Sequence, residues 1–287
     1  MTGSGRRTGP EGSGDALLSV EGLTVGFRTA KGYADILHAV SFAVRPGTTT
    51  CIVGESGSGK SVSCQAVLGL LPANGRRAAG RILFEGRDLA AASEAELETV
   101  RGRGIGMVFQ DPLGSLNPLH TVGTQLRETL RLHTTLSEPQ RQARALELLR
   151  LVGIPEPEQR LASYVHQFSG GMAQRVMIAM ALACEPRLLI ADEPTTALDV
   201  TIQAQILDLL NQLKAELGMA ILFVTHDLGV VAEMADDVVV MRHGRVVEAG
   251  PAERLLNAPE APYTQELLAA MPRLDVAAPI YRERAVS

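Results

Sequence analysis

Several residue types are scarce in this 287-residue sequence, and each absence excludes a class of protein. There is no tryptophan, and aromatic residues make up only 3% of the chain, so the core must be built from aliphatic side chains and methionine. The three cysteines, Cys51, Cys64 and Cys184, show no CxxC spacing. We therefore expect small buried apolar thiols in a reducing compartment rather than a disulfide framework.

Basic charge and long apolar runs are also missing. The net charge of -5 gives no electrostatic reason to expect nucleic acid as the main partner. The longest unbroken apolar run, at 176–184, has nine residues, about half of the ~18 needed to span a bilayer. Residues 1–14 are rich in Gly, Ser and Arg, which predicts a disordered tail and not a signal peptide. If the protein works at a membrane, another chain is expected to supply the spanning segments.

Apolar segments and helical periodicities alternate along the rest of the chain. Continuous apolar strands that alternate with helices predict a mainly parallel sheet covered on both faces. The strands are expected at 48–54, 104–110, 188–193 and 219–226. A hairpin is expected to turn at His243 and Gly244. Between residue 111 and about residue 167 the pattern is helical, with Ser137 as a cap and Gly153 as a stop, which predicts a helical lobe inserted between strands.

The segment "GESGSGKS" at 54–61 matches GxxxxGK[ST] without exception, follows a predicted strand and opens a predicted helix. Its glycines allow consecutive backbone N–H groups to surround phosphate oxygens, and the helix dipole adds positive potential. Lys60 supplies a charge to the β- and γ-phosphates, and the Ser61 hydroxyl can bind Mg²⁺. The expected nucleotide-binding residues of this phosphate loop are Gly54, Glu55, Ser56, Gly57, Ser58, Gly59, Lys60, Ser61 and Val62.

Two carboxylates, Asp192 and Glu193, follow the apolar segment "LLIA". Ligands of open parallel sheets bind at the carboxyl ends of strands. We expect Asp192 to hold the Mg²⁺ shell, directly or through water. Glu193 is then placed to accept a proton from the water that attacks the γ-phosphate, a form of assistance typically worth ~10²–10⁴ in rate.

A second Gly-rich loop, "SGG" at 169–171, also leads into an apolar helix. We call this segment the signature loop. The chain resembles the nucleotide-binding subunit of ABC transporters in the features it carries and in their order along the sequence: the phosphate loop, Gln110, the signature loop, the carboxylate pair, Asp199 and His226. In that family two ATPase domains associate head to tail. The resemblance therefore implies that Ser169, Gly170 and Gly171 complete the ATP site of a partner subunit and not the site at Lys60.

The resemblance implies roles for further residues. Gln110 would sense the γ-phosphate, contribute to the Mg²⁺ site with Ser61 and Asp192, and link the site to the helical lobe. Asp199 would communicate between the two ATP sites, and His226 would contact the γ-phosphate and orient the water. An aromatic residue on an early loop would stack on adenine; Phe27 is the better candidate and Tyr33 the alternative.

The expected fold is α/β, with a P-loop NTPase core. It comprises a mixed, mainly parallel sheet, an N-terminal antiparallel β subdomain and an inserted α-helical subdomain at about 111–170. The tail at 1–14 precedes an ATPase domain at 15–250. Residues 251–287 resemble the C-terminal segment of the oligopeptide-importer branch, although Ala261 and Gln265 stand where histidine and arginine are common.

The flanks of the signature loop and the segment "DPLGSLNP" at 111–118 resemble the dipeptide, oligopeptide and nickel importers. The implied cofactors are ATP and Mg²⁺; no iron–sulfur cluster is expected, because no cysteine follows Cys184. The implied partners are two membrane permease subunits, a second ATPase subunit, identical or related, and an extracytoplasmic solute-binding protein. The protein would lie peripherally on the cytoplasmic face of the membrane.

Alternative functions are distinguished by features that the sequence lacks. Nickel or another small solute could replace peptides as the imported substrate. Soluble ABC ATPases that act on DNA carry long coiled-coil insertions, those that act on ribosomes usually carry two phosphate loops, and exporters commonly fuse the ATPase to membrane spans. We therefore expect an importer ATPase.

Overall fold

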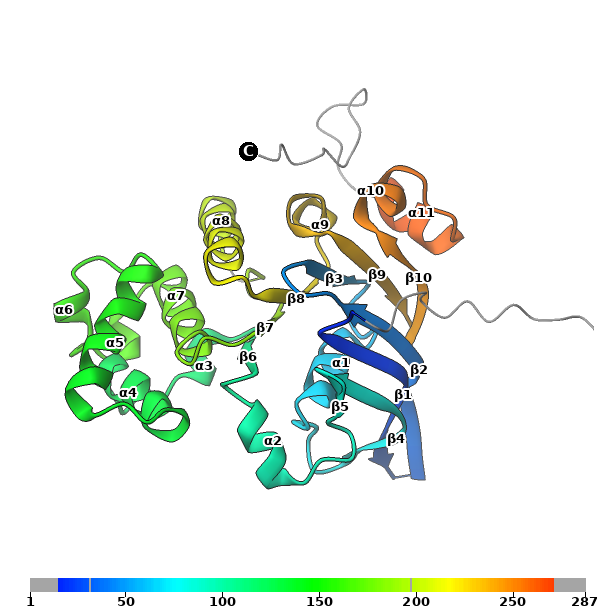
Figure 1. Ribbon diagram of the computed structural model, residues 1–287. Coiled ribbons are helices and arrows are strands. Elements are labelled where there is room, and N and C mark those ends of the chain that lie inside the picture. The colour runs from blue at the N-terminus through cyan, green and yellow to red at the C-terminus, as the bar shows by residue number, and fades with distance from the viewer. Residues whose placement is uncertain (1–14, 31, 197, 271–287) are drawn as a thin grey trace, which may run out of the picture.

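A six-stranded sheet forms the centre of the computed structural model, which describes residues 15–30, 32–196 and 198–270 (Figure 1). The strand order is β10-β9-β3-β8-β7-β6. All neighbours are parallel except the hairpin pair β9 and β10, which turns at His243 and Gly244 as the sequence predicts. The strands are β3 (Thr49–Val53), β6 (Ile105–Val108), β7 (Leu188–Asp192), β8 (Ala220–Thr225), β9 (Asp237–Arg242) and β10 (Arg245–Pro251).

A second, antiparallel sheet has the order β2-β1-β4-β5. Its strands are β1 (Leu18–Thr29), β2 (Gly32–Val44), β4 (Gly75–Phe84) and β5 (Arg87–Asp88). The hydrophobic pattern revealed only the C-terminal half of β2, because residues 32–36 are exposed and are held by backbone pairing with β1 rather than by burial. The predicted N-terminal antiparallel sheet is confirmed, and with the parallel sheet it confirms the predicted fold class.

Helices gather in a lobe beside the parallel sheet, on the left of Figure 1. These are α3 (Pro112–Ser115), α4 (Val122–His133), α5 (Glu138–Leu151), α6 (Pro157–Arg160) and α7 (Gly170–Ala181), with a 3-10 turn at Val165–Gln167. Ser137 caps α5 through a reciprocal pair with Gln140, and Gly153 follows the helix with φ of 70°, so both predicted helix signals are confirmed.

The other helices lie against the two sheets. They are α1 (Lys60–Val67), α2 (Glu94–Val100), α8 (Val200–Leu217), α9 (Leu228–Met234), α10 (Ala252–Asn257) and α11 (Pro262–Ala269). Helix α1 ends at Val67, two residues before Gly69, which takes a positive φ of 64°. Within the described residues, no helix has both the length and the apolar character required to cross a membrane.

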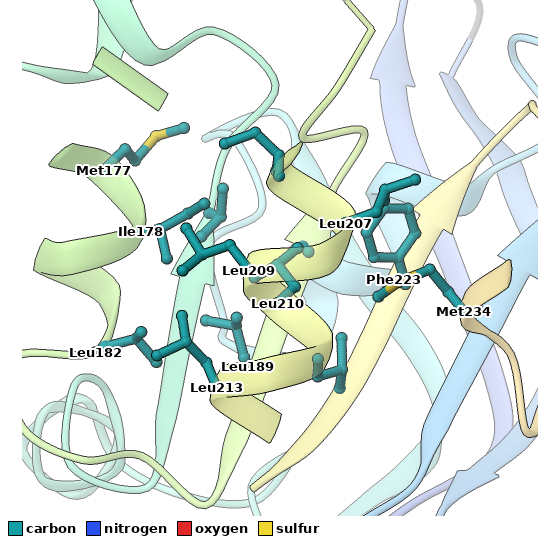
Figure 2. Packing of buried hydrophobic residues seen from close by; sticks show 14 of the residues in the cluster. Met177, Ile178, Leu182, Leu189, Leu207, Leu209, Leu210, Leu213, Phe223 and Met234 are labelled. Carbon is teal, nitrogen blue, oxygen red and sulfur yellow. The ribbon is translucent and has the colours of Figure 1, made fainter. Parts of the chain in front are cut away.

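Hydrophobic residues form a core on each face of the parallel sheet. Successive residues of β3 alternate between the two cores: Cys51 and Val53 face one, and Ile52 faces the other. Figure 2 shows the first core, in which Leu209 and Leu210 of α8 lie between Ile178 of α7 and Phe223 of β8. The same core therefore connects the helical lobe to the sheet. Because this core is closely packed, a displacement of the lobe also shifts side chains that pack on the sheet.

The remaining predictions concern the cysteines and the tails. Cys51 and Cys64 are buried as expected, whereas Cys184 is half-buried, and none of the three forms a disulfide bond. The predicted tail at 1–14 and the end of the C-terminal segment, 271–287, lie outside the described residues.

Candidate nucleotide site

The phosphate loop connects the end of β3 to the first residue of α1. Gly54, Gly57 and Gly59 have φ values of 151°, 78° and 104°, a region that side-chain-bearing residues rarely adopt. A Cβ on Gly54 would also lie 2.1 Å from the Met241 carbonyl oxygen. The loop can therefore keep this path, with its backbone close to neighbouring strands, only with glycine at these positions.

Lys60 is buried and folds back over its own loop. Its Nζ donates hydrogen bonds to the carbonyl oxygens of Gly54 (2.8 Å) and Glu55 (3.0 Å), and lies 3.7 Å from Glu193 Oε1. Burial lowers the pKa of Lys60, while the nearby carboxylates of Glu193 and Asp192 act in the opposite direction. The ammonium group is thus held inside the loop that is expected to receive phosphate.

Ser61 and Asp192 face each other across the base of this loop. The Ser61 hydroxyl donates a 2.8 Å hydrogen bond to Asp192 Oδ1. Asp192 is buried at the end of β7, and burial raises the pKa of its carboxyl despite the Ser61 hydrogen bond and the Lys60 charge. A hydroxyl and a carboxylate at this separation are hard oxygen donors of the kind that Mg²⁺ prefers, so the residues present fit the metal.

Glu193 follows with a positive φ of 47°, a conformation that costs free energy in a residue with a side chain. Its backbone N–H donates to the Val224 carbonyl oxygen at 3.0 Å. Its carboxylate accepts hydrogen bonds from Gln110 Nε2 (3.2 Å) and the Thr196 hydroxyl (2.9 Å), and lies 3.5 Å from His226 Nδ1. These contacts fix the direction of the Glu193 carboxylate at the carboxyl end of β7.

A cavity of about 840 Å³ adjoins these groups, a size typical of small-molecule sites. The phosphate loop, Gln110, Glu193 and His226 all contribute to its wall, so the structure brings together residues predicted separately. Three residues of the wall were missed. Thr196 comes three residues after Glu193, and the "TT" that follows "DEP" is the signal that could have drawn attention to it; Ile36 and Leu267 carry no local signal.

The predicted adenine partners do not contribute to the wall of this cavity. Phe27 is half-buried and packs beside Gly75, where an added Cβ would lie 2.9 Å from the ring. Tyr33 is 49% exposed, and the guanidinium carbon of Arg76 lies 4.1 Å from its ring centroid. Ile36, on the same strand as Tyr33, supplies an apolar side chain to the wall instead.

The signature loop also lies outside this cavity. Ser169 caps α7 by accepting from the Met172 N–H at 3.3 Å, and Asp199 caps α8 by accepting from the Ile202 N–H at 2.9 Å. The two helix starts are close, since a Cβ on Gly171 would lie 2.6 Å from Ile202 Cγ2. Ser169, Gly170 and Asp199 are exposed. Two adjacent helix N-termini, each suited to an anion, therefore lie outside the cavity beside the phosphate loop of their own chain.

Comparison with known families shows the family to which the chain belongs. The family model described as ABC transporter matches residues 37–196, more than half of the chain. The chain belongs to the ABC transporter family. It is therefore an ABC ATPase. A second model, described as the C-terminal region of oligopeptide/dipeptide transporters, matches residues 247–285.

Relatives of this ABC ATPase match over most of its length. The oligopeptide transport ATP-binding protein OppD of Bacillus subtilis (strain 168) is 54% identical over 260 residues, covering 90% of this chain and 73% of the relative. The dipeptide transport ATP-binding protein DppD of Escherichia coli (strain K12) is 51% identical over 257 residues, covering 90% and 79%.

Solved structures agree with the fold. The ATP-binding cassette MJ0796, in a dimeric post-hydrolysis state bound to ADP and Pi, has a TM-score of 0.73 at 28% identity, covering 82% of this chain and 99% of the other. CbiO1 from Clostridium perfringens, part of the ABC transporter complex cbiONQ, has a TM-score of 0.72 at 32% identity, covering 84% and 90%.

Proposed function

We propose that this ABC ATPase powers the import of dipeptides and oligopeptides through separate permease subunits in the membrane. The observation that carries the proposal is the identity of more than half with OppD, a protein named for oligopeptide transport, over 90% of the chain. The match of residues 247–285 to the C-terminal region of oligopeptide/dipeptide transporters supports the same substrate class. A nickel or other small-solute importer is the alternative within the family.

ATP binds in the cavity beside the phosphate loop. The glycine-dependent loop and the start of α1 offer backbone N–H groups to the phosphates, and Lys60 supplies the cation. Lys60 Nζ donates to two loop carbonyl oxygens, and ATP binding exchanges these hydrogen bonds for phosphate oxygens. Ser61 and Asp192, which are hydrogen-bonded to each other, would hold Mg²⁺, and Gln110 would contribute a further ligand. Mg²⁺, when bound, neutralises charge on the phosphate oxygens.

Glu193 is the general base. Its carboxylate is already oriented by Gln110, Thr196 and the His226 ring, and it faces the cavity. Gln110 and His226, which both contact Glu193, would orient the attacking water and the γ-phosphate, and Lys60 would stabilise the charge that develops there. Thr196 holds Glu193 in position through the carboxylate oxygen that it shares with Gln110.

A second ATPase subunit, identical or related, completes each site. The exposed signature loop and Asp199 are supported in this role by their position outside their own cavity and by the adjacent N-termini of α7 and α8. In a head-to-tail pair, Ser169, Gly170 and Gly171 of one subunit lie over the phosphate loop of the other. Phe27 remains the proposed adenine partner, with Tyr33 as the alternative, and either must approach the nucleotide as the pair closes.

The permease subunits dock on the helical lobe. Phe109, Leu113 and Leu119 expose apolar side chains along the segment between β6 and α4, with Leu119 80% exposed. This segment is continuous with Gln110, so a change at the nucleotide is transmitted directly to it. The ATPase would then lie at the cytoplasmic face of the membrane, supplied by an extracytoplasmic solute-binding protein.

Uptake measurements in cells test the proposed substrate. Cells that carry wild-type protein are compared with cells that carry Glu193→Gln, using radiolabelled dipeptides, oligopeptides and Ni²⁺. We expect peptide uptake to be lost with the variant while Ni²⁺ uptake continues. Loss of Ni²⁺ uptake alone would assign the chain to a metal importer, and unchanged uptake of both would refute the peptide proposal.

A further inference from the structure

A helix near the C-terminal end reaches back to the phosphate loop. The backbone N–H of Glu55 donates a hydrogen bond to the Tyr263 hydroxyl of α11 at 3.3 Å, across 208 residues of sequence. Leu267, one helical turn further along α11, contributes to the wall of the nucleotide cavity. Helix α11 therefore contacts the nucleotide site through two side chains: Tyr263 at the phosphate loop and Leu267 at the cavity wall.

Tyr263 is held firmly. It is buried, it belongs to the same hydrophobic core as α8 and β8, and the guanidinium carbon of Arg242 lies 4.4 Å from its ring centroid. The start of α11 is fixed as well, because the Glu248 carboxylate accepts the backbone N–H groups of Glu260 (3.0 Å) and Ala261 (3.1 Å). Burial raises the pKa of Tyr263, so the phenol remains neutral at physiological pH. A neutral, immobile hydroxyl is thus presented to the loop.

The backbone of Glu55 makes two different contacts. Its N–H is bound by Tyr263, and its carbonyl oxygen accepts from Lys60 Nζ at 3.0 Å. The second contact must be released when Lys60 turns to a phosphate, whereas the first need not be. The Tyr263 hydroxyl therefore remains as the contact that keeps the entrance of the phosphate loop in its binding conformation.

We propose that Tyr263 is a positioning residue for the phosphate loop and that α11 forms one wall of the nucleotide site. This inference rests on the proposed binding of ATP beside Lys60. It gives the segment matched to the C-terminal region of peptide transporters a defined part in nucleotide affinity.

The test uses the full-length chain with Tyr263→Phe, which removes the hydroxyl and keeps the ring against Arg242. Tyr164→Phe, in the helical lobe, is the matched control, because it makes the same chemical change at an exposed residue that, among the described residues, has no hydrogen bond to the phosphate loop. The dissociation constant of Mg-ATP is measured with Glu193→Gln in every background to prevent turnover. Melting curves without nucleotide fix a temperature at which all variants are fully folded.

We expect Tyr263→Phe to weaken Mg-ATP binding by about 2- to 10-fold, the range for one net hydrogen bond, and Tyr164→Phe to leave it unchanged. With Glu193 intact, KM for ATP should rise while kcat at saturating ATP stays at the wild-type value, a split that general destabilisation does not produce. Equal affinity and KM in Tyr263→Phe and the control would overturn the inference. Failure of the parent protein itself to bind Mg-ATP would instead refute the proposed nucleotide site.

Discussion

The phosphate-loop side and the signature-loop side of this ABC ATPase differ in how their polar groups are satisfied. On the first side, Lys60, Ser61, Asp192 and Glu193 contact one another or their own loop; Lys60 and Asp192 are buried, and Ser61 and Glu193 are half-buried. On the second side, Ser169 and Asp199 only cap their own helices, and both are exposed. One side is a connected set of side chains around the phosphate loop, and the other is a pair of exposed helix starts.

This difference indicates which groups of the ATP site are arranged within one chain and which are brought by another subunit. Charges that are buried and mutually paired are expensive to assemble, so they are arranged in advance within one chain. Exposed helix N-termini are hydrated until an anion arrives, so they can be brought to the site by association with another subunit. Substitutions on the two sides should therefore fail in different ways.

The largest effect is expected from Glu193→Gln on the phosphate-loop side. Loss of the general base should lower kcat by ~10²–10⁴, while Mg-ATP affinity is retained because Lys60, Ser61 and Asp192 are untouched. Single-turnover hydrolysis and equilibrium binding of ATP measure the two quantities. Hydrolysis at the wild-type rate would show that Glu193 is not the base.

Gly170→Asp, on the signature-loop side, should impair hydrolysis without impairing ATP binding to the monomer. A Cβ at this position meets only Leu198, at 3.9 Å, so the side chain fits, but its carboxylate repels phosphate. We expect hydrolysis by the assembled pair to fall by ~10²-fold, comparable to the loss of a donor to a developing anion, while ATP binding to the monomer is unchanged. Gly170→Asn, of equal size and no charge, is the control. Weakened ATP binding to the monomer would contradict the division between the sides.

A smaller effect on stability should appear with Asp192→Asn. Because the folded-state pKa of Asp192 is raised, above that pKa its buried charge opposes folding, and this cost disappears as the pH falls through it. The variant should therefore melt at a higher temperature than wild type at neutral pH, with a difference that shrinks in acid, although Mg²⁺-dependent turnover is lost. Melting curves without nucleotide over a pH series test this; a less stable variant at neutral pH would be inconsistent with it.

Much of the phosphate-loop side could be predicted because each of its features depends on residues that are close together in the sequence. The phosphate loop, the strand before Asp192 and Glu193, and the caps at Ser137 and Gly153 are all encoded within a few residues. The predicted family, fold class and ATPase activity are confirmed by the family match and the solved structures.

The parts that were missed depend on long-range packing. Tyr263 and Leu267 reach the site only because α10 and α11 return the chain to the phosphate loop. The hydrogen bond of Thr196 depends on the positive φ of Glu193, which no propensity indicates. Phe27 and Tyr33 were chosen for ring chemistry, yet the cavity wall contains Ile36, since the path of β2 and not residue type decides which side chain faces the nucleotide.

Mixing two inactive variants tests the central claim most directly. Lys60→Ala disables the phosphate loop, and Gly170→Asp disables the signature loop. If each site combines the two loops from different subunits, a mixed pair contains one intact site, so ATPase activity should reappear on mixing at concentrations where the wild-type chain hydrolyses ATP. Activity that never exceeds the sum of the separate variants would show that one chain builds its whole site alone.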